Sequence, residues 1–440
     1  MRRIFFVVTS VLLAASVYGQ AVSAKKDVAV FRLSYYSFNV PPNALGRVDA
    51  RIQDVFVNLG RFNVIGMDYR LSEDNISEFI DKLKSFKQAH AKIPEGVHLG
   101  HEAFTEADLS RLAGSFIIVI PDLTSYSLHY ELSIGFTAEL ETSFTFINVD
   151  QMTAFAHFTV RTIGTGSYPN EAIAGAADQL TGQLQYDIRT VPEFQLKTGI
   201  VDVEGNTVLI QLGADMGVKP GDEFAIVTPS VLPSGYVVTH ETGLIIVKEV
   251  QKEVSYARVI YARVKPHVGD QLKELPRFGF ESTFYAHGIF GGTLSGPGSS
   301  IPPIVALGTF AAVTRGFYNF RPLIGVEVPV LPNDYVATAT YGYGGIPINF
   351  YIGGELNWRV WRFDIVPLIG LGFGGLIPLH SGDRFYLSQA GGLIQIGLEF
   401  LVTPQVKVFL DGGVTQWLPL STSYSGYGGF YGGAGISVGY

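Results

Sequence analysis

The residues of this 440-residue chain whose types could support chemistry are charged side chains that recur in its C-terminal part. When residues 276–440 are read as strands of period two, these charges share one face. They are Glu281, Arg321, Glu327, Glu355, Asp364, Glu399, Lys407 and Asp411, and the bases His287 and Arg362 could join them. Enclosed acids and bases could form an ion path or an acid–base set. The alternative, which we favour, is a structural network of ion pairs inside a packed barrel.

Other patterns could bind a metal or a nucleotide. His98, His101 and Glu102, with His90 nearby, offer ligands for a divalent metal. They fall in a predicted loop without a helix to fix their spacing, so we interpret them as a solvated polar loop. Residues 370–375 match G-x-G-x-x-G but lie within a strand pattern, with no helix behind them to receive a phosphate. We interpret these glycines as the lining of a narrow barrel interior.

The sequence therefore predicts no catalytic, cofactor or metal site, and a protein that is not an enzyme. No nucleophile elbow, P-loop or zinc motif is found. Aromatic side chains on the predicted long loops could touch a ligand or rest on lipid headgroups. They are Tyr335, Tyr341, Tyr343, Tyr424 and Tyr427.

The N-terminus predicts export. Arg2 and Arg3 precede an apolar run over residues 4–17, and small residues at 22–24 follow. This is the pattern of a signal peptide over residues 1–24, with Gly19 as a second possible cleavage site. The chain has no Cys, which excludes lipid attachment through Cys, disulfides and thiol chemistry. A formal net charge of −8 argues against a nucleic-acid partner.

Residues 276–440 predict an eight-stranded antiparallel transmembrane β-barrel. All three Trp of the chain lie there, and eight segments alternate between an apolar and a polar or small face. The segments are 279–291, 304–313, 317–330, 346–358, 361–376, 389–402, 406–416 and 428–440. Short and long connections alternate, as the two rims of an outer-membrane barrel require. A soluble sandwich is the alternative, but no second sheet is available to cover eight apolar stripes.

The segment 428–440, GGFYGGAGISVGY, ends on an aromatic residue. Through Gly435, Val438 and Tyr440 it resembles the terminal assembly signal of bacterial outer-membrane barrels. The whole region resembles the small barrels of the OmpA/OmpX type. These resemblances imply outer-membrane lipid and the barrel assembly machinery as partners.

Residues 25–192 predict an α/β domain with the element order β-α-β-α-α-β-β-β-α. Strands are expected at 27–31, 61–65 and 116–121, with alternating segments at 126–146 and 152–162; helices are expected at 44–58, 72–87, 106–113 and 170–186. The stretches VAVF (28–31), LGRFNVI (59–65) and LSRLAGSFIIVI (109–120) resemble the periplasmic module of the TolB N-terminal domain, CsgG and FlgT. Gly114-Ser115 departs from that pattern, and 84–104 reads as an insertion.

Residues 193–275 predict a small β-barrel domain. Short strands flank GADMGVKPGD (213–222), a turn-rich link, and HVGD (267–270) follows as a closing turn. Both resemble the barrel that often accompanies the periplasmic module.

We therefore predict a bacterial outer-membrane protein whose plugged barrel anchors residues 25–275 in the periplasm. As a secretion- or flagellar-assembly-like module, that region would dock to an unidentified periplasmic protein or cell-wall partner and could form a homo-oligomer. The alternative is a small channel, or a surface ligand-binding or adhesin barrel.

Overall fold

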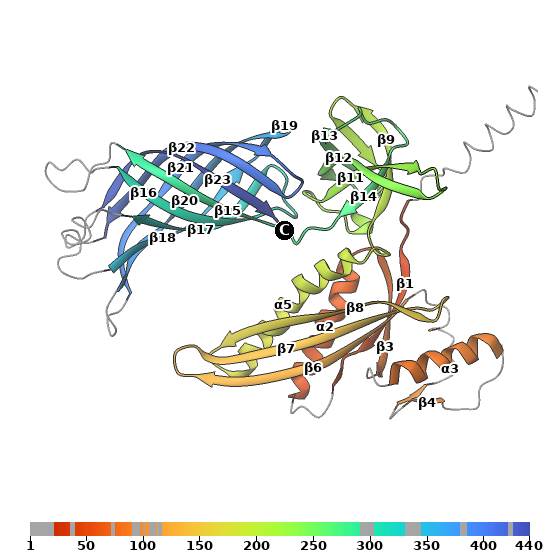
Figure 1. The fold of residues 1–440 in the computed structure, drawn as a ribbon. Helices are drawn as coiled ribbons and strands as arrows, with labels where there is room; N and C mark the ends of the chain where they lie inside the picture. The colour runs from red at the N-terminus through yellow and green to blue at the C-terminus, as the bar shows by residue number, and fades with distance from the viewer. Residues whose placement is uncertain are drawn as a thin grey trace, which may run out of the picture. The chain divides into compact units, whose positions relative to one another are not determined.

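The computed structural model describes residues 22–35, 40–71, 75–89, 97–99, 102–104, 112, 117–290, 303–330, 345–378, 385–420 and 426–440. Most of the expected signal peptide, residues 1–21, lies outside them. The chain divides into two compact units, which we describe separately (Figure 1). The first comprises Met1–Thr198, Leu212–Val218 and Gln251–Glu253, and the second comprises Gly199–Gln211, Lys219–Val250 and Val254–Tyr440. None of the helices in the described residues is long and apolar enough to cross a membrane.

The first unit is a mixed sheet with helices on its faces. Its strands are β1 (Lys26–Arg32), β2 (Ser34–Tyr35), β3 (Phe62–Arg70), β6 (Ile117–Glu131), β7 (Gly135–Asn148) and β8 (Thr153–Gly166). Its helices are α2 (Pro42–Asn58), α3 (Ile76–Ala89) and α5 (Pro169–Thr190). The strand order is β3-β1-β6-β7-β8, with β1 parallel to both its neighbours and β6, β7 and β8 antiparallel.

Alternation along the central strand explains the layers of this unit. Val28 and Val30 of β1 pack with the apolar faces of α2 and α5, whereas Ala29 and Phe31 pack with Phe79 of α3 on the opposite face. A strand with both faces buried must be apolar at successive positions, and β1 is. The helices therefore cover both faces of the sheet.

One expectation for this unit needs correction, and another falls mostly outside the described residues. The segment predicted at 126–146 is a hairpin, because the strand that begins at Ile117 continues to Glu131 and turns at residues 132–134 before β7. Gly135, with φ +92°, supplies the left-handed backbone that the turn requires. The short helix predicted at 106–113 lies outside the described residues except for Leu112, which is helical and buried. Within 84–104, α3 reaches Ala89, and β4 (Val97–Leu99) pairs with β5 (Glu102–Phe104).

The second unit begins with a closed six-stranded barrel. Its strands are β9 (Lys197–Glu204), β10 (Thr207–Ile210), β11 (Glu223–Val231), β12 (Val237–Val250), β13 (Ser255–Ala262) and β14 (Gln271–Leu275). They close in the order β10-β13-β12-β11-β14-β9. Each strand sends an apolar side chain to the buried interior: Ile200, Val208, Phe224, Ile245, Ala257 and Leu272. The 213–222 link contains a one-turn 3-10 helix, η2 (Ala214–Met216), which belongs to the first unit and ends at Gly217, where φ is +75°.

An eight-stranded antiparallel barrel follows, as predicted. Its strands are β15 (Phe280–Phe290), β16 (Ile304–Val313), β17 (Phe320–Val330), β18 (Gly345–Leu356) continued by β19 (Trp358–Val360), β20 (Phe363–Pro378), β21 (Tyr386–Leu401), β22 (Val406–Pro419) and β23 (Tyr427–Gly439). Neighbours in sequence pair with one another, and β15 pairs with β23 to close the ring. The side chains of Thr283 and Ser437 meet there, with their Oγ atoms 2.9 Å apart.

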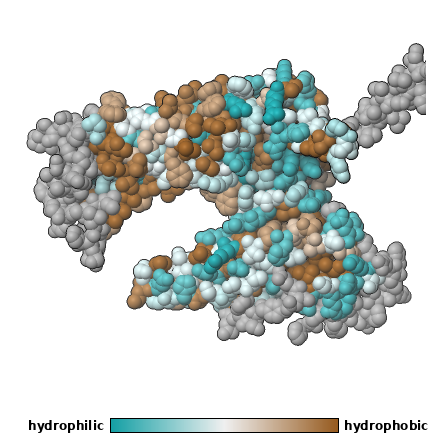
Figure 2. All heavy atoms as spheres, in the orientation of Figure 1, coloured by the Kyte–Doolittle hydropathy of each residue, from teal (hydrophilic) through white to brown (hydrophobic). Residues whose placement is uncertain are grey.

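The exterior of this barrel is apolar, and Figure 2 shows apolar residues gathered over its outer surface. One exposed example from each strand is Phe284, Leu307, Ile324, Ile352, Leu371, Ile396, Leu410 and Phe430. Aromatic and aliphatic side chains fill much of the interior: Tyr285, Phe310, Leu323, Tyr351, Leu368, Leu393, Phe409 and Tyr431. The interior is therefore a packed core.

The turn after the fourth strand differs from the prediction. We expected the strand to end at Trp358 and a turn at Arg359 and Val360. Instead, β19 extends the ladder to Val360, which pairs with Phe363, and Trp361 adopts φ +58° in a tight two-residue turn. Arg359 thereby becomes a strand residue that faces the interior.

Candidate functional site

The candidate site is the set of charged side chains inside the eight-stranded barrel. Every Asp, Glu, Lys and Arg in strands β15–β23 faces inward. All of them are largely enclosed: Glu281, Arg321, Glu327, Glu355, Arg359, Asp364 and Glu399 are at most 7% exposed, and the side chains of Lys407 and Asp411 are 12% and 1% exposed. The eight residues singled out from the sequence are all among them. The structure gathers them into two groups.

The first group lies toward the short-turn end of the barrel and centres on two bases. Arg321 Nη1 donates to Glu281 Oε2 at 3.2 Å and to Glu355 Oε1 at 3.3 Å. Lys407 Nζ donates to Glu281 Oε2 and Glu399 Oε2, both at 2.9 Å. Each base is thus shared between carboxylates that come from different strands, which ties those strands together.

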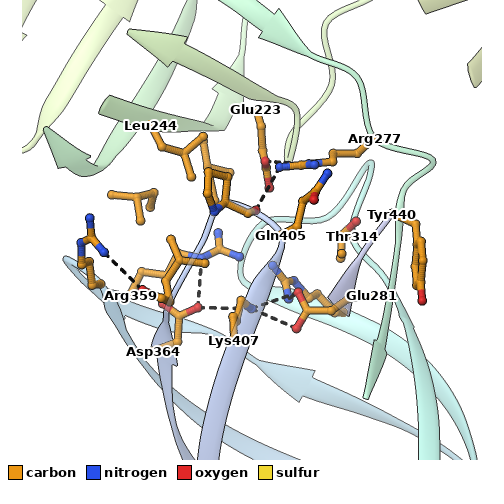
Figure 3. A pocket seen from close by; sticks show the side chains of 18 of the residues that line it. Glu223, Leu244, Arg277, Glu281, Thr314, Arg359, Asp364, Gln405, Lys407 and Tyr440 are labelled. Atoms are coloured by element: carbon orange, nitrogen blue, oxygen red, sulfur yellow. Dashed lines mark hydrogen bonds and ion pairs between the residues drawn. The ribbon is translucent and has the colours of Figure 1, made fainter. Parts of the chain in front are cut away.

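Asp364 belongs to the same group. Its Oδ2 lies 3.6 Å from both Lys407 Nζ and Arg359 Nε, and Figure 3 shows Lys407 between Asp364 and Glu281. The guanidinium of Arg359 also lies 4.9 Å from the centre of the Tyr318 ring. Sequence reasoning missed Arg359 because we placed the turn two residues too early, which left this residue outside the strand. Arg359 lies an even number of residues after Glu355 and so shares its inward face, which was the signal that could have identified it.

The second group surrounds His287 in the middle of the lumen. Its ring stacks between Tyr285 and Tyr431, at centroid distances of 4.2 and 4.3 Å. Nε2 lies 3.0 Å from Asp411 Oδ2, and Nδ1 lies 3.7 Å from Glu327 Oε2. A neutral imidazole has only one N–H, whereas an imidazolium can donate toward both acids. The geometry therefore suits a charged His287 between two carboxylates.

Tyrosines that we did not single out complete this group. Tyr285 Oη donates to Glu327 Oε2 at 3.3 Å and lies 3.0 Å from Tyr351 Oη. Small residues make room for these rings: a Cβ added at Gly308 or Gly325 would lie 2.1 or 2.2 Å from the Cζ atom of Tyr285 or Tyr351. Large rings opposite glycines on neighbouring strands were the available sequence signal.

Tyr427 needs a correction. We expected it on a long loop, but it lies in β23, is 2% exposed and accepts a hydrogen bond from Asn349 within the lumen. The other four loop tyrosines lie outside the described residues. Arg362, a possible member of the charge set, does not join the network; its guanidinium stacks 4.3 Å from the Tyr261 ring of the six-stranded barrel.

Hydrogen bonds and ion pairs join the short-turn end of the eight-stranded barrel to the six-stranded barrel within the same unit. Arg315 Nε donates to Asp222 Oδ1 at 2.8 Å, and Arg277 Nε donates to Glu223 Oε2 at 2.9 Å. The Gly316 N–H donates to the carbonyl of Pro220 at 2.7 Å. Although Arg315 lies in a short turn, where an exposed side chain is expected, its side chain is only 14% exposed. Its partner lies 93 positions away, so no local pattern could reveal it.

An apolar cluster reinforces this contact. Leu244 and Ile246, on the outer face of β12, pack with Tyr318, in the turn before β17, and with Leu401, the last residue of β21. Because Ile245 and Val247 fill the interior of the smaller barrel, β12 is buried on both faces. The two barrels therefore share a packed, ion-paired contact.

Two further patterns singled out from the sequence are the possible metal ligands near residue 98 and the glycines at 370–375. His98 and Glu102 fall in the β4 and β5 strands, but their side chains, together with His90 and His101, lie outside the described residues. In the part of the chain that is described, no group of His, Asp or Glu has the arrangement of a metal site. The glycines at 370–375 lie within β20, and an added Cβ at Gly370 would stand 2.8 Å from Tyr351 Cδ2.

The residues of the expected assembly signal lie in or directly after β23. Val438 and Tyr440 occupy the alternating positions that face outward. Gly435 faces inward, opposite Tyr285 and Phe409. An added Cβ at Gly435 would lie 2.5 Å from Phe409 Cζ. Packing against Phe409 therefore explains why a glycine is present at this position, independently of any recognition signal.

Comparison with known proteins finds fold likenesses and no relatives. No family model matches the chain, and no curated protein matches it. Among solved structures it resembles Neisserial surface protein A (12% identity, TM-score 0.27, covering 37% of this chain and 97% of that one) and Ail, the attachment invasion locus protein of Yersinia pestis (13%, 0.23, 36% and 98%). It also resembles the lipoprotein GNA1162 from Neisseria meningitidis (11%, 0.22, 37% and 97%). These values are too low to support a functional argument.

Proposed function

We propose that this chain is a non-enzymatic outer-membrane protein in which a plugged eight-stranded barrel anchors a periplasmic scaffold formed by residues 25–275. The observation that carries the proposal is the inverted barrel: apolar side chains outside, and ion pairs with packed rings inside. An apolar exterior of this extent is stable in lipid and very unfavourable in water. A filled interior favours an anchor over a pore.

The position of the six-stranded barrel supports a periplasmic location for the N-terminal part. It attaches at the rim formed by the short turns near residues 315, 361 and 403, and both β15 and β23 reach that rim. In outer-membrane barrels the short turns face the periplasm. The expected likeness of residues 25–192 to the TolB, CsgG and FlgT module belongs to this proposal and agrees with that side.

Two apolar hairpin tips are the contact points that we propose for envelope partners. In the first unit, Leu132 at the β6–β7 turn is 96% exposed and Ile134 is also exposed. In the second unit, Val231 and Tyr236 at the β11–β12 turn are exposed. Large apolar side chains at the ends of projecting hairpins fit a protein or cell-wall partner, or a second copy of the chain, better than they fit water.

Two experiments test this function. Photo-crosslinking residues placed at Leu132 and Tyr236 in intact cells should each capture an envelope component, while the same residue at the polar, exposed Asn206 should capture none. The full mature chain in planar bilayers should pass almost no ion current. A sustained single-channel conductance would instead support the alternative of a small channel. The absence of crosslinked products at both hairpin tips would contradict the scaffold function.

A further inference from the structure

Four charges of the lumen lie at the very start of their strands, at the short-turn end of the eight-stranded barrel, and yet they are buried. Each is the second residue of its strand: Glu281 in β15, Arg321 in β17, Asp364 in β20 and Lys407 in β22. Side chains at the mouth of an open barrel would meet water, but these four are at most 12% exposed. Another part of the chain therefore covers this mouth.

The six-stranded barrel provides that cover within the second unit (Figure 3). Leu244, Ile246 and Ile260 line the same small space as Arg321 and Lys407. That space amounts to about 40 Å³. Since one water molecule needs about 10–15 Å³, it has room for about three waters. An apolar roof thus lies over the end of the charge network, with space for only a few water molecules between them.

The first short turn, between β16 and β17, packs directly on the six-stranded barrel. The ion pair of Arg315 with Asp222 joins the two. Next to it, Gly221 adopts φ +86°, and a Cβ added there would lie 2.2 Å from the carbonyl oxygen of Thr314. The two backbones therefore meet with no room for a side chain between them.

The other two short turns also contact the six-stranded barrel. In the turn between β19 and β20, the guanidinium of Arg362 stacks on the Tyr261 ring. At the turn between β21 and β22, Arg277 links Glu223 to the Pro404 carbonyl through two hydrogen bonds of 2.9 Å. Every short turn of the larger barrel is thus held, so the contacts surround the mouth.

We propose that the six-stranded barrel is a fixed lid, which closes the short-turn mouth of the eight-stranded barrel and shields the lumen charges from bulk water. The apolar roof and the contacts at all three short turns support this role. Exclusion of water strengthens the ion pairs beneath the lid, because charges interact more strongly where the medium is less polarisable. The lid is a property of the second unit alone, so it does not depend on which envelope partner the scaffold binds.

Thiol labelling tests the lid, since the chain has no Cys and an introduced Cys is its only thiol. Leu244→Cys and Ile260→Cys each place a thiol under the lid, and Val264→Cys places one on the exposed surface of the same barrel. A charged methanethiosulfonate reagent is added to the full mature chain, folded in detergent micelles. Labelling at the first two sites should be at least about tenfold slower than at Val264. If either site in a folded chain labels as fast as Val264→Cys, the mouth is not closed and the proposal fails.

Two matched glycine variants then test what holds the lid. Gly221→Ala directs a methyl group at the Thr314 carbonyl and should raise the labelling rate of Leu244→Cys about tenfold. Gly235→Ala, in the β11–β12 turn, is the control, because its φ of +84° matches that of Gly221 while nothing lies within 4 Å of its added Cβ. It should leave the labelling rate unchanged. Retention of the thermal unfolding transition shows that each variant is folded, and equal labelling rates in folded variants would overturn the proposal that contacts at the rim hold the lid closed.

Discussion

The two closed barrels of this chain are built from the same alternating strands, yet one is the inverse of the other. In the six-stranded barrel Phe224 and Ile245 fill the interior, and charged residues such as Lys248 face outward. In the eight-stranded barrel Glu355 is buried, and Ile352 is 69% exposed on the outer face. Period two specifies which residues share a face, but the surrounding medium decides which face is inside.

The comparison also shows how a charged interior becomes tolerable. Each carboxylate near the short-turn end of the lumen meets an arginine or lysine, whereas apolar side chains fill most of the interior of the small barrel, with Glu274 of β14 as a buried exception. Removing one member of a buried ion pair leaves an uncompensated charge in a poorly polarisable interior. Inverting a barrel therefore makes its stability depend on a few bases.

The largest effect is expected for Arg321→Ala, which leaves Glu281 and Glu355 without a shared partner. It should lower the free energy of unfolding of the eight-stranded barrel by about 3–5 kcal/mol. Arg263→Ala, at an exposed position of the small barrel, should change stability by less than about 0.5 kcal/mol. Urea unfolding in detergent micelles, followed by the shift in gel mobility on unfolding, measures both. Equal losses would contradict the ion-pair account.

A second test exchanges the exteriors. Ile352→Lys places a charge on the apolar outer face, which the proposed function assigns to lipid, and should cost about 2–4 kcal/mol near the bilayer midplane. Val264→Lys, at an exposed site of the small barrel, faces water and should cost less than about 0.5 kcal/mol. Refolding equilibria in lipid vesicles provide the measurement. A tolerated lysine at Ile352 would argue that this face does not contact lipid.

A third test concerns space in the lumen. Gly325→Ala directs a methyl group at the Tyr351 ring and should destabilise the barrel by about 1–3 kcal/mol. Gly432→Ala is the matched control, since its added Cβ would meet only the Asp411 carbonyl at 3.8 Å. Thermal unfolding of the two variants should differ by several degrees. If both behave alike, the rings are not held by the glycines opposite them.

The smallest effect is expected outside both barrels, at Asp187 in α5. Partial burial of this carboxyl group makes its charged form less favourable. Burial raises the pKa of Asp187 in α5 to about 6. A raised folded-state pKa gives stability that is present below the unfolded value of 3.8 and lost as pH rises through about 6. Because Asp187 is only half-buried, solvent screening reduces the loss to about 1 kcal/mol. Asp187→Asn should therefore stabilise the first unit at pH 8 and not at pH 4.

Hydrogen exchange of α5 amides at the two pH values measures this change. Asp178→Asn, on the same helix but engaged by Arg51 at 2.7 Å, is the control and should bring no gain at pH 8. A gain for Asp187→Asn that is equal at both pH values would show that its cause is not ionisation.

The sequence allowed the eight-stranded barrel and the inward parity of residues such as Glu355 and Lys407 to be predicted, because alternation is a local property. Arg359 was missed because a turn can move by two residues without disturbing that alternation. The Arg315–Asp222 pair was missed because it joins two domains that appear separate in the sequence. The hairpin at residues 132–134 was missed because its turn retains Leu132 and Ile134, apolar residues that read as a continuing strand.

The pairing of β15 with β23 has a consequence for how the molecule is made. Thr283 and Ser437, which meet across this seam, are 154 residues apart in the chain. Closing this contact therefore carries the largest loop-closure entropy cost of any strand pair in the barrel, and the edge of β15 stays unpaired until β23 has been synthesised. An exposed apolar edge is a template for aggregation. We therefore expect that protection of the β15 edge before closure, together with fast pairing of β15 and β23, raises the fraction of chains that reach the folded state.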